Sequence, residues 1–243
     1  MQWIKTKLQE GQKINTCLMN TKVSLILIVF LFSLMAMKQV KKKRVVFFGD
    51  SITQMGVSAG GYIVRANEIL ATKSLSDQYE LIGAGIGGNK IYDLYLRLED
   101  DVLAKNPDIV VIWVGVNDVW HKASFGTGTD PDKFEKFYNA IIKKLQSRNI
   151  QVLLATPAAI GERTDNSNQQ DGDLNFYSNI IRKIAVTNNC GLIDLRKEFI
   201  AYNLSHNNEN KESGILTTDR VHLNEVGNRF VAEKMVAALT TLH

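Results

Sequence analysis

The feature that most constrains this chain is a regular alternation of short apolar runs with longer amphipathic stretches, from Arg44 to the C-terminus. The apolar runs, rich in Val, Ile, Leu and Phe, occupy 45–48, 79–82, 109–114, 152–155 and 191–195. The stretches with helical periodicity occupy 62–72, 91–104, 131–148, 174–188 and 225–239. Near-continuous apolar strands that alternate with helices are typical of a parallel sheet covered on both faces.

This alternation predicts an α/β fold with three layers, α/β/α, around a doubly wound parallel sheet with right-handed crossovers. Five strands favour a flavodoxin-like strand order of 2-1-3-4-5. The chain shows no internal repeat and no segment with the composition of a linker. We therefore expect a single domain over residues 44–243.

Residues 1–43 form a separate N-terminal segment that we expect to be a signal or an anchor. Val23 to Met37 is an uncharged, mostly apolar run that would span about 22 Å as a helix, short of a bilayer core of about 30 Å. That length favours the apolar region of a secretory signal, and a start at Met19 would give the usual signal layout. The expected location is periplasmic or extracellular. The basic cluster Lys38 to Arg44 leaves open an uncleaved membrane anchor, and a buried helix is a third interpretation.

Charge and cysteine content narrow the classes of partner. Nine of the 29 Lys and Arg, but one of the 25 acids, lie in residues 1–44, so residues 45–243 carry a net charge of −4. This balance does not favour a nucleic-acid surface. Two cysteines make no disulfide framework, and Cys190, at the start of an apolar run, is expected to be a buried thiol and not a nucleophile. The sequence makes no prediction about oligomeric state.

Polar and glycine-rich segments follow the predicted strands. In a doubly wound sheet, ligands bind at the carboxyl ends of the strands, which lie along one edge. The segments that end there are 49–51, 83–89, 115–118 and 156–173, and a last polar segment, 217–222, precedes the final helix. The catalytic or binding residues are therefore sought in these five segments.

Ser51, Asp219 and His222 have the residue types and spacing of a hydrolytic triad. A catalytic serine needs a base within hydrogen-bond reach and a group that orients that base. Among the four histidines, only His222 has a carboxylate three residues before it, at Asp219. On a turn, this spacing lets the acid hold one ring nitrogen while the other faces the serine. The alternative is that Asp219 caps the last helix and His222 is a surface residue.

Gly88 and Asn117 are candidate donors to an oxyanion. Gly88 follows the second strand, where a residue without a side chain leaves its backbone N–H accessible, and the Asn117 amide follows the third strand. Each alone is equally well explained as a turn residue. Together with Ser51 and His222, however, they place four suitable residues in order on four strand ends.

The four segments resemble the motifs of the SGNH hydrolases, in the GDSL lipase/esterase superfamily. They are FFGDSIT with Ser51, GIGGNK with Gly88, GVND with Asn117, and DRVH with His222. The resemblance extends from Arg44 to Leu239. In the second motif Gly85 and Gly87 are the other alignments, and Asn89 stands where Asp is common.

This resemblance implies a serine esterase that works through an acyl-enzyme, with no metal or organic cofactor. It assigns Ser51 as nucleophile, His222 as base and Asp219 as its partner. The oxyanion donors would be the N–H groups of Ser51 and Gly88 and the amide of Asn117. The G-x-S-x-G motif of the α/β-hydrolases is absent around Ser51.

Two other function classes remain to be weighed. Residues 83–88 also match G-x-G-x-x-G, a dinucleotide-binding motif, but the candidate ribose-binding acids Asp100 and Asp101 lie in an amphipathic stretch instead of at a strand end. A non-catalytic carbohydrate-binding module would be expected to lack a triad residue, and none is missing.

The substrate is less constrained than the reaction. The loops 122–130 and 158–173 lie on the site side, so they are either specificity elements or solvated surface. Trp120 offers a stacking face or a packing contact. His121 is expected to be a loop residue without function, and the sequon at Asn203 is expected to be a chance match.

A polar mouth without a long apolar lid favours a small acyl group, acetyl in particular, on a glycan or another small polar alcohol. A lysophospholipase or thioesterase acting on lipid is the alternative.

Overall fold

The computed structural model describes residues 41–242. The expected signal or anchor over 1–43 therefore lies almost wholly outside the described residues. Within 41–242, no helix combines the length and the apolar character that a bilayer span requires.

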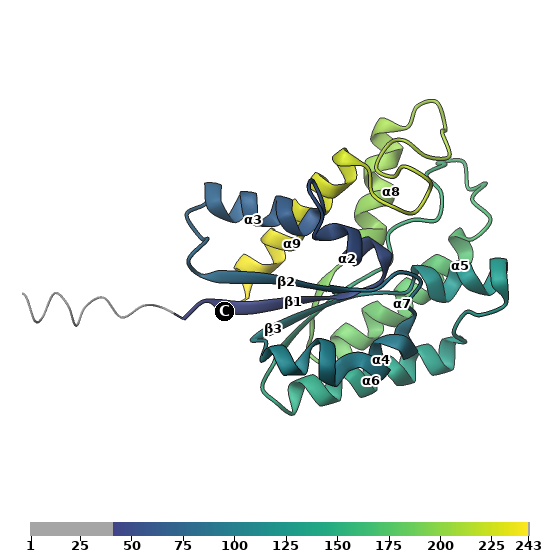
Figure 1. Ribbon diagram of the computed structural model, residues 1–243. Helices are drawn as coiled ribbons and strands as arrows, with labels where there is room; N and C mark the ends of the chain where they lie inside the picture. The colour runs from purple at the N-terminus through teal and green to yellow at the C-terminus, as the bar shows by residue number, and fades with distance from the viewer. Residues whose placement is uncertain (1–40, 243) are drawn as a thin grey trace, which may run out of the picture. The chain divides into compact units, whose positions relative to one another are not determined.

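A five-stranded parallel sheet forms the centre of the fold, in the order β2-β1-β3-β4-β5 (Figure 1). The predicted fold class and strand order are confirmed. The strands are β1 (Lys43–Gly49), β2 (Tyr79–Gly85), β3 (Ile109–Trp113), β4 (Gln151–Ala155) and β5 (Gly191–Ile193). Every residue of β3 is buried, as expected for a central strand with helices on both faces.

Helices cover both faces of the sheet. In Figure 1, α3 and α9 lie on one face of the sheet and α4, α6 and α7 on the other. Their bounds are α3 (Tyr62–Thr72), α4 (Ile91–Asp101), α6 (Pro131–Gln146), α7 (Asp171–Thr187) and α9 (Glu225–Thr241). Each of these five predicted helices is therefore present. A 3₁₀ turn at Leu103–Lys105 follows α4, and Asn106 ends this turn in a left-handed backbone conformation.

Three helices were not predicted: α2 (Ser51–Gly56), α5 (Val116–Phe125) and α8 (Leu195–His206). They begin at or just after the carboxyl ends of β1, β3 and β5. The expectation that His121 lies in a loop is wrong, because α5 includes it. Strand β5 ends two residues earlier than expected because the Asp194 side chain accepts a hydrogen bond from the Lys197 N–H and caps α8.

Strand β2 is longer than expected and includes Gly85, the first glycine of the GIGGNK motif. It continues to Gly85, which pairs with Gly49 at the end of β1. A Cβ atom at Gly85 would lie 2.1 Å from the backbone nitrogen of Gln54 in α2. Glycine is needed here because α2 packs directly against the end of β2.

Three minor expectations have clear outcomes. Cys190 is half-buried instead of fully buried, and its burial raises the pKa of the thiol to about 11, so at neutral pH it is a poor nucleophile. Asn203 is buried in α8, 5% exposed, which agrees with a sequon that matches by chance. Trp120 is half-buried and packs against the core, as the packing interpretation expects.

Candidate active site

Ser51 lies at the sharp turn from β1 into α2. Asp50 caps the helix, with its Oδ1 accepting the Ile52 N–H at 3.0 Å. A Cβ atom at Gly49 would lie 2.4 Å from the Trp113 carbonyl oxygen, so the strand end has room only for glycine. Ser51 is the first residue of α2, and its own N–H therefore has no acceptor within the helix.

The structure brings Ser51, His222 and Asp219 together in one line of hydrogen bonds. Ser51 Oγ lies 3.0 Å from His222 Nε2, and His222 Nδ1 lies 2.7 Å from Asp219 Oδ2. Partial burial opposes ionisation of Asp219, but the hydrogen bonds from the His222 ring and backbone outweigh it and lower the pKa of the carboxyl. An ionised Asp219 favours the tautomer with the proton on Nδ1, which leaves Nε2 as an acceptor facing Ser51.

A short hairpin, residues 217–223, carries Asp219 and His222. It is closed by a β-bridge between Thr217 and Leu223. The alternative that Asp219 caps the last helix is wrong. The N-cap of α9 is Asn224, whose side chain accepts the Gly227 N–H at 2.9 Å.

Gly88 lies in the turn after β2, with a φ of +74° that favours glycine. Within residues 41–242 its N–H has no hydrogen-bond acceptor, whereas the Gly87 N–H is bound by Gln54 Oε1 at 2.7 Å. Gly85 lies inside β2. Of the three glycines considered from the sequence, Gly88 is therefore the one with a free N–H at the turn. His121 is its neighbour, since a Cβ atom at Gly88 would lie 3.7 Å from His121 Cε1.

Asn117 is in the first turn of α5, next to the end of β3, and is 2% exposed. Its Nδ2 donates one hydrogen bond to the Asn89 carbonyl oxygen, with a separation of 3.1 Å. This contact orients the amide and leaves the second N–H of Nδ2 available to a ligand. Asn117 therefore has the donor chemistry expected of it.

Arg97, on α4, is a structural residue that the sequence did not reveal. Its guanidinium donates to the carbonyl oxygens of Gly49 and Ala84, at 2.8 and 3.0 Å, and to Asn89 Oδ1 at 2.7 Å. It thus joins the ends of β1 and β2 to the turn that holds Gly88. In sequence it is one charged residue on an amphipathic helix, so only the fold shows this role.

Two buried carboxyl groups lie directly beside the motif residues. Burial raises the pKa of Asp50 and of Asp118 to about 7 each. Asp118 Oδ1 accepts the Ile91 N–H at 3.2 Å, and its Oδ2 is buried with no hydrogen-bond partner among the described residues. The two groups repel each other when both are ionised, which further favours the protonated form of Asp118.

The dinucleotide-binding interpretation does not match the positions of its residues. Gly83 and Gly85 are in β2, not in a turn between strand and helix, and Asp100 and Asp101 are both in α4. A ribose-binding acid would stand at the end of a strand.

Comparisons with known proteins agree with the motifs. Residues 47–230 match the model of the GDSL-like Lipase/Acylhydrolase family. The crystal structure of an acetyl xylan esterase, AlAXEase, is 73% identical, covers 81% of this chain and 99% of its own, and superposes with a TM-score of 0.79.

Two curated relatives also match. The acetylxylan esterase of Geobacillus stearothermophilus is 26% identical over 211 residues, 78% of this chain and 90% of that protein. The platelet-activating factor acetylhydrolase IB subunit alpha1 of Bos taurus is 33% identical over 89 residues, 36% of this chain and 34% of that protein. The family model covers most of the chain and includes all four motifs in full. From its motifs, its fold and this match, the chain belongs to the GDSL-like lipase/acylhydrolase family of serine ester hydrolases.

Proposed function

We propose that this protein removes acetyl groups from carbohydrate esters, with Ser51 as the nucleophile. The observation that carries the proposal is the line of contacts from Ser51 Oγ to His222 Nε2, 3.0 Å, and from His222 Nδ1 to Asp219 Oδ2, 2.7 Å. These distances match the hydrogen-bond reach that a general base and its orienting acid require.

The proposed reaction has two steps. In the first, His222 Nε2 takes the Ser51 hydroxyl proton while Oγ bonds to the acetyl carbonyl carbon. The resulting intermediate loses the sugar alcohol, which receives the proton from His222, and leaves an acetyl-serine. In the second step His222 takes a proton from water, the hydroxide bonds to the same carbon, and acetic acid leaves as His222 returns the proton to Ser51 Oγ. Asp219 stays ionised and stabilises the charged imidazole in both steps.

The negative oxygen of each tetrahedral intermediate needs donors that are already in place. The candidates are the N–H groups of Ser51 and Gly88 and the Asn117 amide. All three follow the ends of β1, β2 and β3. Among residues 41–242 the N–H groups of Ser51 and Gly88 have no acceptor, and the Asn117 amide keeps one N–H beyond the one that it donates to Asn89. Such donors stabilise charge without reorganisation during the reaction.

The acetyl group and the carbohydrate are supported by similarity and by the surface beside the hairpin. The names of the relatives reported above all specify an acetyl group, and two of them specify xylan. A cavity of about 370 Å³, lined mainly by polar side chains of the 160–170 segment together with Glu212 and Arg220, borders the residues that carry His222. Amide, guanidinium and carboxylate groups suit the hydroxyls of a sugar.

The substrate is tested with the full chain on three p-nitrophenyl esters, acetate, butyrate and octanoate, and then on acetylated xylooligosaccharides. We expect the highest kcat/KM on acetate among the three esters, and release of free acetate from the oligosaccharides. A preference for octanoate, with no acetate released from the sugar, would contradict the proposal and favour the lipid acyl hydrolase.

We also propose that the protein is exported. The support is the apolar run Val23 to Met37 and the polymeric nature of a glycan substrate, which is met outside the cell. The mass and N-terminal sequence of the protein recovered after expression of the full chain test this. A shortened protein outside the cytoplasm fits a cleaved signal, an intact protein in the membrane fraction fits an anchor, and an intact cytoplasmic protein would contradict export.

A further inference from the structure

Glu162 is a buried carboxylate that the proposed reaction does not use. It lies at the start of the 158–173 loop and is 1% exposed. Residues 158–162, the first part of the loop, are all buried, so the solvated-surface interpretation is wrong for them, although Ile160 and Gly161 line the cavity described above. A buried acid in such a position needs several hydrogen-bond donors.

The donors to Glu162 are three consecutive backbone N–H groups at the base of the 217–223 hairpin. Glu162 Oε2 accepts from Ile215 at 2.9 Å, and Oε1 accepts from Leu216 at 2.7 Å and from Thr217 at 2.9 Å. Charge-assisted hydrogen bonds of this kind are about twice as strong as neutral ones. The carboxylate therefore fixes the strand from which the hairpin starts.

The neighbouring residue, Gly161, holds the tip of the same hairpin. Its N–H donates to the Arg220 carbonyl oxygen at 2.9 Å. Arg220 stands between Asp219 and His222 and has a φ of +83°, a conformation that costs free energy for a residue with a side chain. Gly161 itself has a φ of +101°, and a Cβ atom there would lie 2.3 Å from Asn168 Oδ1.

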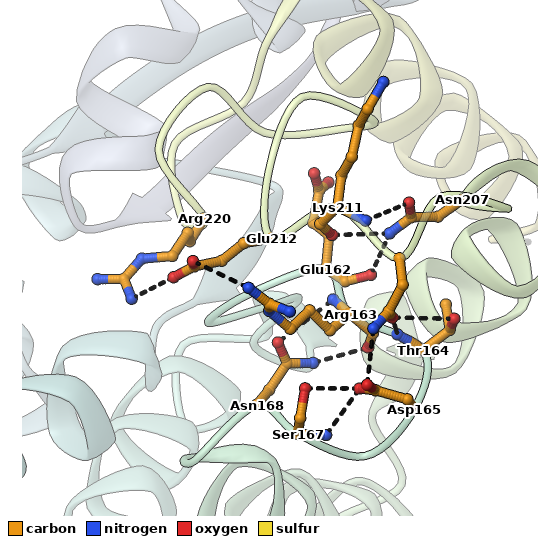
Figure 2. Close-up of polar contacts among 11 residues, drawn as sticks. Glu162, Arg163, Thr164, Asp165, Ser167, Asn168, Asn207, Lys211, Glu212 and Arg220 are labelled. Carbon is orange, nitrogen blue, oxygen red and sulfur yellow. Dashed lines mark hydrogen bonds and ion pairs between the residues drawn. The ribbon is translucent and has the colours of Figure 1, made fainter.

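Two side-chain contacts, from Asn207 and from Glu212, also bear on the positions of Glu162 and the hairpin. In Figure 2, Asn207 reaches the Glu162 backbone, and its Nδ2 donates to the Glu162 carbonyl oxygen at 2.7 Å. The Arg220 guanidinium lies 2.7 Å from Glu212 Oε1, but this ion pair is exposed and contributes little. The contacts of Gly161 and Glu162 are buried, so they constrain the hairpin more than this ion pair does.

We infer that Glu162, together with Gly161, is a positioning residue that sets the distance between His222 and Ser51. Residues 161 and 162 hold the hairpin at both its tip and its base, and the hairpin carries both Asp219 and His222. Ser51 lies on a separate element, α2, so a shift of the hairpin changes the contact from Oγ to Nε2 directly. Displacements of about 1 Å at a reacting pair can cost about 10²-fold in rate.

The test is Glu162→Gln in the full chain, with Asp108→Asn as the matched control. Glutamine has the same shape, but its Nε2 is a hydrogen-bond donor. It would therefore face a backbone N–H group from which the carboxylate oxygen accepts a hydrogen bond. Asp108 Oδ2 also accepts a backbone N–H, that of Arg44 at 2.7 Å, at the opposite edge of the sheet. We expect kcat on p-nitrophenyl acetate to fall about 10²-fold with KM within about threefold in Glu162→Gln, and to stay at the wild-type value in Asp108→Asn.

Two further readouts separate positioning from a loss of stability. The first is the rate at which a p-nitrophenyl alkylphosphonate labels Ser51, which depends on proton removal by His222. The second is the low-field proton resonance of His222 Nδ1 in its contact with Asp219. We expect Glu162→Gln to slow labelling by the same factor as kcat and to shift or broaden the resonance, while circular dichroism stays that of the folded protein.

A folded Glu162→Gln with a lower melting temperature, but with kcat and labelling within threefold of wild type, would overturn the inference. If Glu162→Gln does not fold, Glu162→Asp decides. Its carboxylate is one methylene shorter and cannot reach the three N–H groups unless the hairpin moves, so reduced kcat and labelling are expected and wild-type rates would overturn the inference. The kcat readout rests on the proposed function. Labelling does not, so a wild-type protein that is inactive on acetyl esters but labelled at Ser51 would fail the proposed function alone.

Discussion

Asp219 holds His222 at two points, the ring and the main chain. Its Oδ2 lies 2.7 Å from the ring nitrogen Nδ1, and its Oδ1 accepts the backbone N–H of the same residue at 2.8 Å. Oδ1 also accepts the Val221 N–H at 3.1 Å. One carboxylate therefore sets both the orientation of the imidazole and the path of the hairpin around it.

Asp219→Asn is expected to lower kcat while the protein stays folded. An amide at this position can present its Nδ2 to the ring, which favours the tautomer with the proton on Nε2 and removes the acceptor that faces Ser51. Because the Asp219 side chain is about half exposed, water can partly take the place of the carboxylate in the variant. We expect kcat to fall by roughly 10–10³-fold. Steady-state kinetics on p-nitrophenyl acetate measure this, and a kcat within threefold of wild type would show that Asp219 does not orient the base.

Gly88→Ala tests whether the turn after β2 must keep its left-handed backbone for catalysis. The new Cβ would have its nearest contact with His121 Cε1 at 3.7 Å, an ordinary van der Waals distance, so the cost is backbone strain of about 1–2 kcal/mol. Relief of that strain would turn the Gly88 N–H away from the substrate. Gly60→Ala is the matched control, with a φ of +79° and no close neighbour. We expect similar losses of unfolding free energy in both variants, but a lower kcat only in Gly88→Ala, and equal kcat values would contradict the assigned role.

Asn117→Ala removes the side-chain donor proposed for the oxyanion. Loss of one such donor typically lowers kcat by about 10²–10³-fold with little effect on KM. Asn139→Ala is a control, because Asn139 Nδ2 donates to the Glu135 carbonyl oxygen within α6 and contacts none of the motif residues described above. If both variants kept wild-type kcat on p-nitrophenyl acetate, the amide of Asn117 would have no part in the reaction.

Asp50→Asn tests the buried acid beside the nucleophile by its effect on stability. Native Asp50 keeps its proton up to about pH 7 because burial raises its pKa, whereas the unfolded chain loses it near 3.8. Between these values the native state binds more protons, so the free energy of unfolding falls as the pH rises. Asparagine can still accept the Ile52 N–H and does not titrate.

Urea unfolding of wild type and Asp50→Asn at about pH 4 and about pH 7 measures this effect. We expect the variant to lose less stability over that interval, by roughly 1–4 kcal/mol. Asp77→Asn is the control, since the Asp77 side chain is fully exposed. Parallel pH dependences for wild type and Asp50→Asn would show that the carboxyl of Asp50 is ionised in the native state at neutral pH.

The sheet and its five main helices were predictable because the local preferences of their residues match the secondary structure that they adopt. Helix α3 has the predicted bounds, and α6 begins at Pro131, a residue favoured at the first helical position. Helix α5 was missed because Asn117 and Asp118 are poor helix formers in a helix interior, whereas they stand in its first turn, where an acidic residue is favourable.

The triad could be found in the sequence because its acid and base are three residues apart. Glu162 could not, because its three donors are 53–55 residues away and its burial exists only in the folded chain. Its surroundings in sequence, a glycine and several polar residues, are those of an exposed loop. Catalytic residues that are close in sequence, such as Asp219 and His222, leave a recognisable spacing. A residue that positions them from a distant part of the chain, such as Glu162, leaves none.

The most direct test of this account is the initial rate of p-nitrophenyl acetate hydrolysis by the full chain and by Ser51→Ala, measured side by side with the same purification. The account predicts turnover by wild type and a loss of at least about 10³-fold in Ser51→Ala, since the variant lacks the hydroxyl that forms the acyl-enzyme. A Ser51→Ala protein that keeps its rate within tenfold of wild type would contradict it, because the esterase would then not use the Ser51, His222 and Asp219 site.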